Sequence, residues 1–315
     1  MYILMSNTSK VYVLIFMLIY VAAFAAAVFV YQLSFTDILI TFLCVGLGFS
    51  FIAWLLTQNI KPELTDKPPF KNESFVLILL TCWIVLYITY GGTFINNLLP
   101  KNIQKDEQLQ FFIVIARKLI VFVIIPYLIY RAFGFALKDF GLKVSLQKTF
   151  TKKNLLVFIV LSACILLFQY FFSNGAKPLR EGQFSAAQLV PSIPLTFLWL
   201  FIEAGLVEEF FFRTVLQSRL AALLKSQWGA TLVGGLIFGL AHAPGLYLRG
   251  AEGEGINEQL PFWFWLGYCI VNMSIAGIFL GITWSRTKNL YLVMALHAMI
   301  DLIPNISAFI HTWKI

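Results

Sequence analysis

The chain has 315 residues, of which 60% are hydrophobic and only 12% are charged. This composition leaves too few polar groups to cover the apolar surface in water, so it excludes a soluble globular domain and requires lipid as the solvent. The formal charge of +8 does not indicate nucleic-acid binding, because the cations lie between apolar runs and form no basic stripe with interleaved aromatic residues.

Nine apolar runs follow one another along the chain, each near the roughly 20 residues that cross a bilayer as a helix. They cover residues 11–31, 38–57, 75–96, 111–137, 155–172, 194–224, 228–243, 262–283 and 290–310. The run at 228–243 is the shortest, so the sequence predicts an all-α polytopic transmembrane helix bundle of about eight to nine spans. The first run is too long for a cleaved signal peptide and is predicted to remain as an anchor.

Charged residues in two of the connecting loops predict the orientation of the chain. Cations gather around the loop that follows the fourth run: Arg131, Lys138, Lys143, Lys148, Lys152 and Lys153. Acidic residues gather in the loop near Arg249: Glu252, Glu254 and Glu258. Because cytoplasmic loops are enriched in Lys and Arg, the first loop is expected inside the cell. The amino terminus is then also cytoplasmic, in a multi-pass protein of the cell (cytoplasmic) membrane.

The same loop divides the chain into three predicted parts. Residues 1–134 form the N-terminal transmembrane helices, 135–153 the basic cytoplasmic loop, and 154–315 a second helix bundle. In the first part, the main intramembrane charges are Arg117 and Lys118. They can line a cavity, bind lipid headgroups, or mark a helix that begins later than the apolar run; we favour the last two interpretations together.

Polar residues are concentrated in the spans of the second half. They are Glu203, Glu208, Glu209, Arg213, His242, Asn272, His297 and Asp301. Ionisable groups are costly within a membrane, so this concentration indicates a functional site.

Two neighbouring carboxylates of this set face different ways on one helix. At about 100° per residue, Glu209 and Arg213 share a face, whereas Glu208 points away from both. Glu209 and Arg213 are therefore predicted to form an i, i+4 ion pair. Glu208 has no counter-ion on its own helix, so it is available as a general base or acid, or for a structural hydrogen bond between helices.

Two further segments place imidazoles in the spans. Phe238 and His242 share one helical face, and His297 lies one turn from Asp301 on another helix. Asp301 is close enough to orient the His297 ring or to favour its protonated form. Alone, the second pair can also be an interhelical clasp or half of a metal site.

The depths of these groups in the membrane allow them to meet. Glu208 lies 17 residues before the turn at Lys225, and His242 lies 14 residues after the next run begins. At about 1.5 Å per residue, both lie roughly 20 to 25 Å from that turn on adjacent antiparallel helices. His297 lies about 12 Å from the same side, a shortfall that helix tilt can reduce.

Three motifs thus occur in a fixed order: Glu208 and Glu209 with Arg213, then Phe238 with His242, then His297 with Asp301. This order is similar to the pattern EExxxR, FxxxH and HxxxN/D of the CAAX protease and bacteriocin-processing (ABI) family of intramembrane glutamic endopeptidases. The resemblance covers roughly residues 135 to 306 and does not extend to the first four spans. It implies that 154–315 is the catalytic helix bundle.

The resemblance also implies an activity, the hydrolysis of a peptide bond in a membrane-associated protein or peptide. Glu208 is then the general base with His242 as its partner, and His297 with Asp301 stabilises the oxyanion. An ionised Asp301 cannot donate a hydrogen bond, so either it is protonated or it stabilises a cationic His297 that donates. The other motif residues, implied as structural support, are Glu209, Arg213 and Phe238.

The sequence leaves other functions open. The same family includes members proposed to act in bacteriocin immunity or as scaffolds, and a proton-coupled transporter also uses intramembrane Glu and His. A zinc metalloprotease is a further alternative, but HExxH is absent, and we predict no metal and no cofactor. The predicted partners are the lipid bilayer and a membrane-associated substrate, with no nucleic acid.

Overall fold

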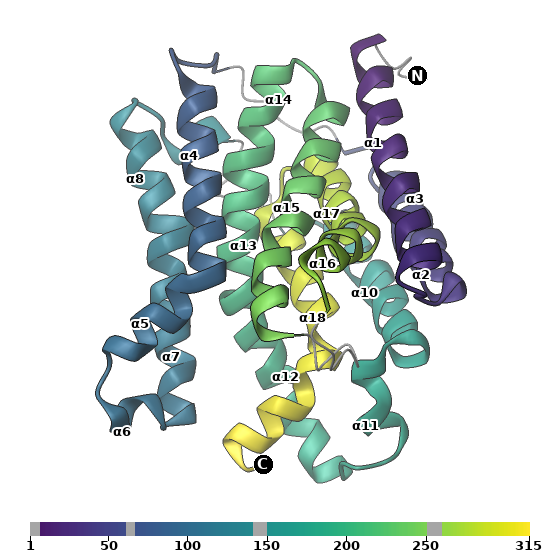
Figure 1. The fold of residues 1–315 in the computed structure, drawn as a ribbon, viewed down its shortest axis with the longest axis vertical. Helices are drawn as coiled ribbons and strands as arrows, with labels where there is room; N and C mark the ends of the chain where they lie inside the picture. The colour runs from purple at the N-terminus through teal and green to yellow at the C-terminus, as the bar shows by residue number, and fades with distance from the viewer. Residues whose placement is uncertain (1–6, 61–66, 141–149, 251–259) are drawn as a thin grey trace.

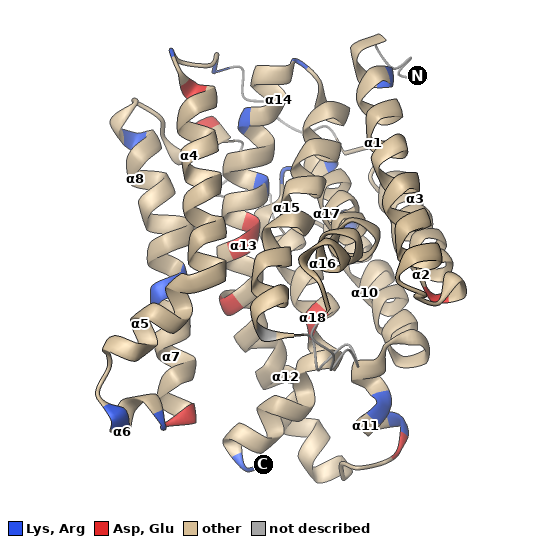
Figure 2. Ribbon diagram, in the orientation of Figure 1, with Lys and Arg blue, Asp and Glu red and all other residues tan. Residues whose placement is uncertain are grey.

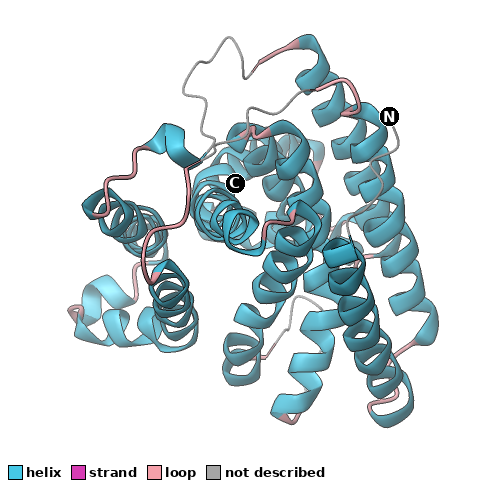
Figure 3. Ribbon diagram, turned by 90° about the horizontal axis from the view of Figure 1, so that it is seen from above, coloured by secondary structure: helices cyan, strands magenta, loops and turns pink. Residues whose placement is uncertain are grey.

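The computed structural model describes residues 7–60, 67–140, 150–250 and 260–315. Regular structure in these ranges is helical throughout, without a strand (Figure 3). Nine helices of the described chain are long and apolar enough to cross a membrane: Asn7–Val30, Phe35–Leu56, Glu73–Leu98, Glu107–Ala132, Lys152–Phe172, Ala186–Leu224, Gln227–Leu248, Phe262–Thr287 and Leu290–Trp313. The predicted all-α polytopic bundle is therefore confirmed. The shortest apolar run becomes a span of 22 residues.

Most spans are built from consecutive α-helical and π-helical segments, so their labels change along one continuous helix. The first half contains α1 (Asn7–Ala25), η1 (Ala26–Val30), α2 (Phe35–Thr41), η2 (Phe42–Phe49), α3 (Ser50–Leu56), α4 (Glu73–Leu86), η3 (Tyr87–Gly91), α5 (Gly92–Leu98), α6 (Lys101–Gln104), α7 (Glu107–Lys118), η4 (Leu119–Ile124), α8 (Ile125–Ala132) and η5 (Leu137–Phe140). The second half contains α10 (Lys152–Phe172), η6 (Asn174–Ala176), α11 (Lys177–Arg180), α12 (Ala186–Leu200), η7 (Phe201–Leu206), α13 (Val207–Glu209), η8 (Phe210–Gln217), α14 (Ser218–Leu224), α15 (Gln227–Arg249), α16 (Phe262–Tyr268), η10 (Cys269–Met273), α17 (Ser274–Thr287) and α18 (Leu290–Trp313).

The spans are arranged around the helices of the second half. Helices α4 to α8 lie on one side of α13, α15 and α18, and α1 to α3 lie on the other, with the two termini at opposite ends of the bundle (Figure 1). Large apolar side chains such as Leu14, Phe51 and Phe94 are exposed on the outside, as expected for a surface that faces lipid. Charged positions lie mainly near the two ends, with a small group at mid-height around α13 (Figure 2).

Glycines allow the central helices to approach one another closely. A Cβ atom on Gly205 would lie 2.6 Å from the Met294 carbonyl oxygen, and one on Gly235 would lie 2.9 Å from the Ile278 backbone nitrogen. Both separations are too short for any side chain, so only glycine permits these backbone contacts. The sixth span thus packs directly against α18, and α15 against α17.

Two tight turns at one end of the bundle connect the central helices. Lys225 and Lys288 adopt the left-handed conformation, with φ of 49° and 47°, and end α14 and α17. The side chains of Ser226 and Asn289 then accept backbone N–H groups of the next helix, which caps α15 and α18. These turns set the antiparallel register of the helices that carry the predicted site residues.

A buried ion pair joins the first half of the chain to the sixth span. Arg219 Nε and Nη2 donate to the two Glu73 carboxylate oxygens at 2.5 and 2.9 Å. Near this pair, the Ala136 amide and Lys67 hold the pKa of the Asp139 carboxyl below its usual range.

Of the predicted basic loop 135–153, residues 135–140 and 150–153 are described, while Lys143 and Lys148 lie outside the described residues. The acidic residues of the loop near Arg249 also lie outside them: Glu252, Glu254 and Glu258.

Candidate active site

The predicted ion pair on the sixth span is confirmed. Arg213 Nε donates to Glu209 Oε2 at 2.8 Å, and both side chains are completely buried. The guanidinium also lies over the Phe238 ring, 5.0 Å from its centroid. Glu209, Arg213 and Phe238 therefore form a packed, largely charge-neutral wall behind the neighbouring carboxylate, Glu208.

Glu209 has a second partner that the sequence does not predict. His297 Nδ1 lies 2.8 Å from Glu209 Oε1, and because a carboxylate only accepts, Nδ1 carries the proton and donates. This contact joins the sixth span to α18 and orients the His297 ring so that its Nε2 points away from Glu209. The close approach of Gly205 to α18 makes room for it.

Glu208 faces both imidazoles from the opposite side of its helix. Its Oε2 lies 3.7 Å from His242 Nε2 and 3.9 Å from His297 Nε2, and its side chain is 13% exposed. These separations are too long for direct hydrogen bonds but are within reach of one bridging water molecule. The structure therefore brings together the three groups whose depths in the sequence predict a meeting.

The environment of His242 determines which ring nitrogen faces Glu208. His242 Nδ1 lies 2.7 Å from the Phe238 carbonyl oxygen, so Nδ1 must be the protonated donor. In the neutral ring, Nε2 then carries a lone pair directed toward Glu208. The His242 side chain is also the more accessible of the two imidazoles, at 24% exposed against 6% for His297.

Asp301 completes the cluster at its more accessible end. Its Oδ2 lies 3.4 Å from His297 Nε2, as expected for residues one helical turn apart. Three residues further on, Pro304 lacks the N–H that would bond the Ile300 carbonyl oxygen, and α18 changes direction in its last turns (Figure 1). The Gln169 side chain from α10 donates to that oxygen instead, so the helix continues to Trp313.

The interpretation that Arg117 and Lys118 mark a helix that begins later than the apolar run is wrong for both residues. The helix begins at Glu107, well before both residues, and Lys118 Nζ lies 2.5 Å from Glu203 Oε1 and 3.9 Å from Glu208 Oε1. Arg117 points elsewhere and donates to the Gly92 carbonyl oxygen at 2.9 Å. One signal for this contact was present in the sequence, since an intramembrane lysine and an intramembrane glutamate are expected to pair.

Other polar residues of the second half lie outside this cluster. The Asn272 side chain donates to the Tyr268 carbonyl oxygen at 3.3 Å, within its own helix. His311 is exposed near the end of the chain and contacts the Phe184 ring. Among the described residues, no group of three or more His, Cys, Asp or Glu side chains has the geometry to hold a metal ion.

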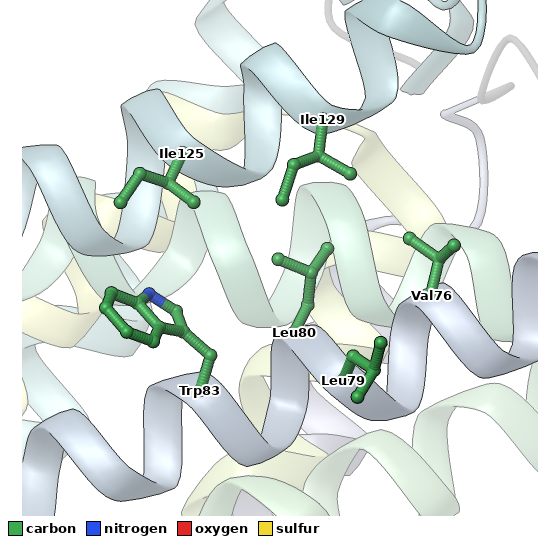
Figure 4. A pocket seen from close by; sticks show the side chains of 6 residues that line it. All are labelled: Val76, Leu79, Leu80, Trp83, Ile125 and Ile129. Atoms are coloured by element: carbon green, nitrogen blue, oxygen red, sulfur yellow. The ribbon is translucent and has the colours of Figure 1, made fainter.

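An apolar groove of about 420 Å³ lies away from these residues, between α4 and α8 (Figure 4). Its walls are made by Val76, Leu79, Leu80, Trp83, Ile125 and Ile129. Leu79 and Trp83 are exposed on the lipid-facing surface, so the groove opens toward lipid and none of the predicted site residues lines it.

The described residues form nine apolar helices around a group of carboxylates and imidazoles, which define a polytopic membrane protein with an acid–base site inside its helix bundle. Residues 190–303 match the family model of the type II CAAX prenyl endopeptidases, described as Rce1-like. The resemblance seen in the sequence motifs is thereby confirmed for this segment of the chain, and its similarity to that family supports a CAAX-type intramembrane protease at the level of the family. The matched segment contains Glu208, His242, His297 and Asp301 but not Lys118. Neither the comparison with curated proteins nor that with solved structures found a match.

Proposed function

We propose that the protein is an intramembrane endopeptidase of the glutamic type, in which Glu208 and His242 activate water to cleave a membrane-associated peptide. The main support is the arrangement of Glu208 Oε2, 3.7 Å from His242 Nε2 and 3.9 Å from His297 Nε2. A water molecule among these atoms can donate to the carboxylate and present its oxygen to a substrate carbonyl carbon. No covalent acyl-enzyme is needed.

The proton path follows from the hydrogen bonds of the two residues. Glu208 removes a proton from the attacking water, and the lone pair of His242 Nε2, kept in place by the bond from Nδ1 to the Phe238 carbonyl, accepts the second hydrogen bond of that water. The proton on Glu208 then passes to the leaving amine as the C–N bond breaks. The base and the acid are thus the same carboxyl group at two stages.

His297 is placed to stabilise the oxyanion. Glu209 accepts from Nδ1, and Asp301 lies 3.4 Å from Nε2, so both nitrogens of the ring face carboxylate oxygens. This environment fits a cationic ring whose Nε2–H donates to the developing negative charge, with Asp301 as its counter-ion. In this arrangement an ionised Asp301 has no need to donate.

We further propose that the protein lies in the cell membrane with its amino terminus in the cytoplasm. The nine described spans put the turns at Lys225 and Lys288 on the same side as the amino terminus, together with Arg286. Cations at this end agree with the enrichment of Lys and Arg in cytoplasmic loops.

Cleavage by wild-type protein and by Glu208→Gln, both reconstituted in lipid vesicles, tests the proposed activity. The probes are a fluorogenic farnesylated peptide that ends in a CAAX sequence and the same peptide without the prenyl group, together with terminal proteomics of a membrane-protein library. Because Gln cannot accept the proton from water, cleavage should fall by at least about 100-fold. Glu181→Gln, at an exposed position outside the spans, is the matched control and should cleave like wild type.

Three outcomes would contradict this proposal. Identical fragment profiles for wild type and Glu208→Gln would favour a scaffold or immunity role without catalysis. Reversible loss of cleavage with a chelator, restored by zinc, would favour a metalloprotease. Solute flux in vesicles without any cleavage would favour a transporter.

A further inference from the structure

The N-terminal half of the chain supplies a cation to the site. Lys118 ends α7 on the fourth span, outside the segment 190–303 that matches the protease family. Its Nζ lies 2.5 Å from Glu203 Oε1, 3.4 Å from the Glu203 carbonyl oxygen and 3.9 Å from Glu208 Oε1. The ammonium group therefore lies between two carboxylates of the sixth span, and its side chain is 22% exposed.

A π-helical turn brings these two carboxylates to the same cation. Glu203 and Glu208 are five residues apart, which would turn their side chains about 140° from each other in a regular α-helix. The segment Phe201–Leu206 is π-helical, and such turns bond residues five apart rather than four. Both side chains can then reach Lys118 from one helix.

The charges of the cluster leave no substitute for this lysine. The cluster contains four carboxylates, those of Glu203, Glu208, Glu209 and Asp301. Arg213 is bound to Glu209, so among the described residues Lys118 is the one Lys or Arg within ion-pair distance of Glu203 or Glu208. Without Lys118, Glu208 would face only the two imidazoles, and Glu203 would have no Lys or Arg of the described residues within ion-pair distance. Charges buried without partners are costly.

We infer that Lys118 is a positioning residue of the active site, which holds Glu208 in the orientation that activates water. The ammonium attracts Oε1, and this leaves Oε2 directed at His242 and His297. Glu203 anchors the ammonium so that it does not neutralise Glu208 through a closer direct bond. This inference rests on the proposed function and adds a residue from the fourth span to the site.

Steady-state kinetics of Lys118→Met test this role with the farnesylated CAAX peptide in vesicles. A base that is misdirected by about 1 Å loses on the order of 10²-fold in rate, so kcat should fall by about 10- to 100-fold with KM within about threefold of wild type. Lys118→Arg keeps the charge and should restore much of kcat. Arg117→Met removes the neighbouring cation on the same helix and should leave both constants within about twofold of wild type. A Lys118→Met variant with the kcat of Arg117→Met, or with only KM changed, would overturn the inference.

A second measurement separates this inference from the proposed function because it needs no cleavage. Thermal unfolding is followed for Lys118→Met, Glu203→Gln and the double variant. Each single change leaves a charge without its partner, so each should lower the unfolding midpoint. The decrease for the double variant should be clearly smaller than the sum of the two single decreases. Additive shifts would overturn the inference. If the shifts of the two variants are not additive but the wild-type protein cleaves no probe, the ion pair is supported and only the protease activity is contradicted.

Discussion

Glu208 and Glu209 are adjacent in the chain but have different surroundings. Glu209 is completely buried and accepts from Arg213 and His297, each at 2.8 Å. Glu208 is 13% exposed, and its Oε2 lies 3.7 Å from His242 Nε2, too far for a direct hydrogen bond but close enough for one water molecule beside the two atoms to bond to both. A carboxylate with both oxygens bonded to buried donors stabilises the fold, whereas one that makes no direct hydrogen bond to a buried donor is available to a reactant.

The two residues should therefore respond differently to the same substitution. Glu209→Gln leaves Arg213 as a buried cation without its counter-ion, and we expect the free energy of unfolding to fall by about 3 kcal/mol or more. Glu208→Gln should change it by less than about 1 kcal/mol, because this residue has no buried partner at hydrogen-bond distance. Denaturant unfolding in detergent measures both. Equal losses for the two variants would contradict the division of roles.

At the scale of the secondary-structure element, α18 holds two site residues close to a proline. Pro304 removes the hydrogen bond to the Ile300 carbonyl, and the Gln169 side chain from α10 replaces it. Asp301 lies between these two positions in the chain, one turn from His297. A donor from a different span thus supports the part of the helix that presents Asp301.

Removing that donor should therefore cost stability only while the proline is present. Gln169→Leu leaves the partly buried Ile300 carbonyl without this partner and should lower the free energy of unfolding by about 1 to 3 kcal/mol. In a Pro304→Ala background the restored N–H bonds the carbonyl, so the same substitution should cost clearly less. The exposed Gln183→Leu serves as the control and should have little effect. If Gln169→Leu lowers the free energy of unfolding equally in both backgrounds, the hydrogen bond from Gln169 to the Ile300 carbonyl is not the source of the stabilisation.

At the scale of the whole molecule, an odd number of described spans places the two termini at opposite ends (Figure 1). The end with the amino terminus also carries the turns at Lys225 and Lys288, whereas Glu181 lies at the other end, between the fifth and sixth spans. If the amino terminus is cytoplasmic, as proposed, Lys225 and Lys288 lie on the cytoplasmic side of the membrane and Glu181 lies on the outer side.

Labelling of single cysteines with a membrane-impermeant maleimide in whole cells tests this orientation. In a background without the four native cysteines, Glu181→Cys should react and Lys225→Cys should not, because the second lies inside the cell. After the cells are opened, both should react, which controls for the accessibility of each exposed position. The reverse pattern in whole cells would place the amino terminus outside.

The sequence by itself determined an all-α bundle of about eight to nine spans, the Glu209–Arg213 pair and the similar depths of Glu208 and His242. These features depend on run length, helical periodicity and depth, which are properties of each span alone. Only the tertiary structure decided that Glu208 faces His242 and His297, that Lys118 and Glu203 join it, and that Glu209 also binds His297. Contacts between distant spans depend on how closely glycines let helices pack and on where π-helical turns rotate a face, and neither is set by the regular helical repeat.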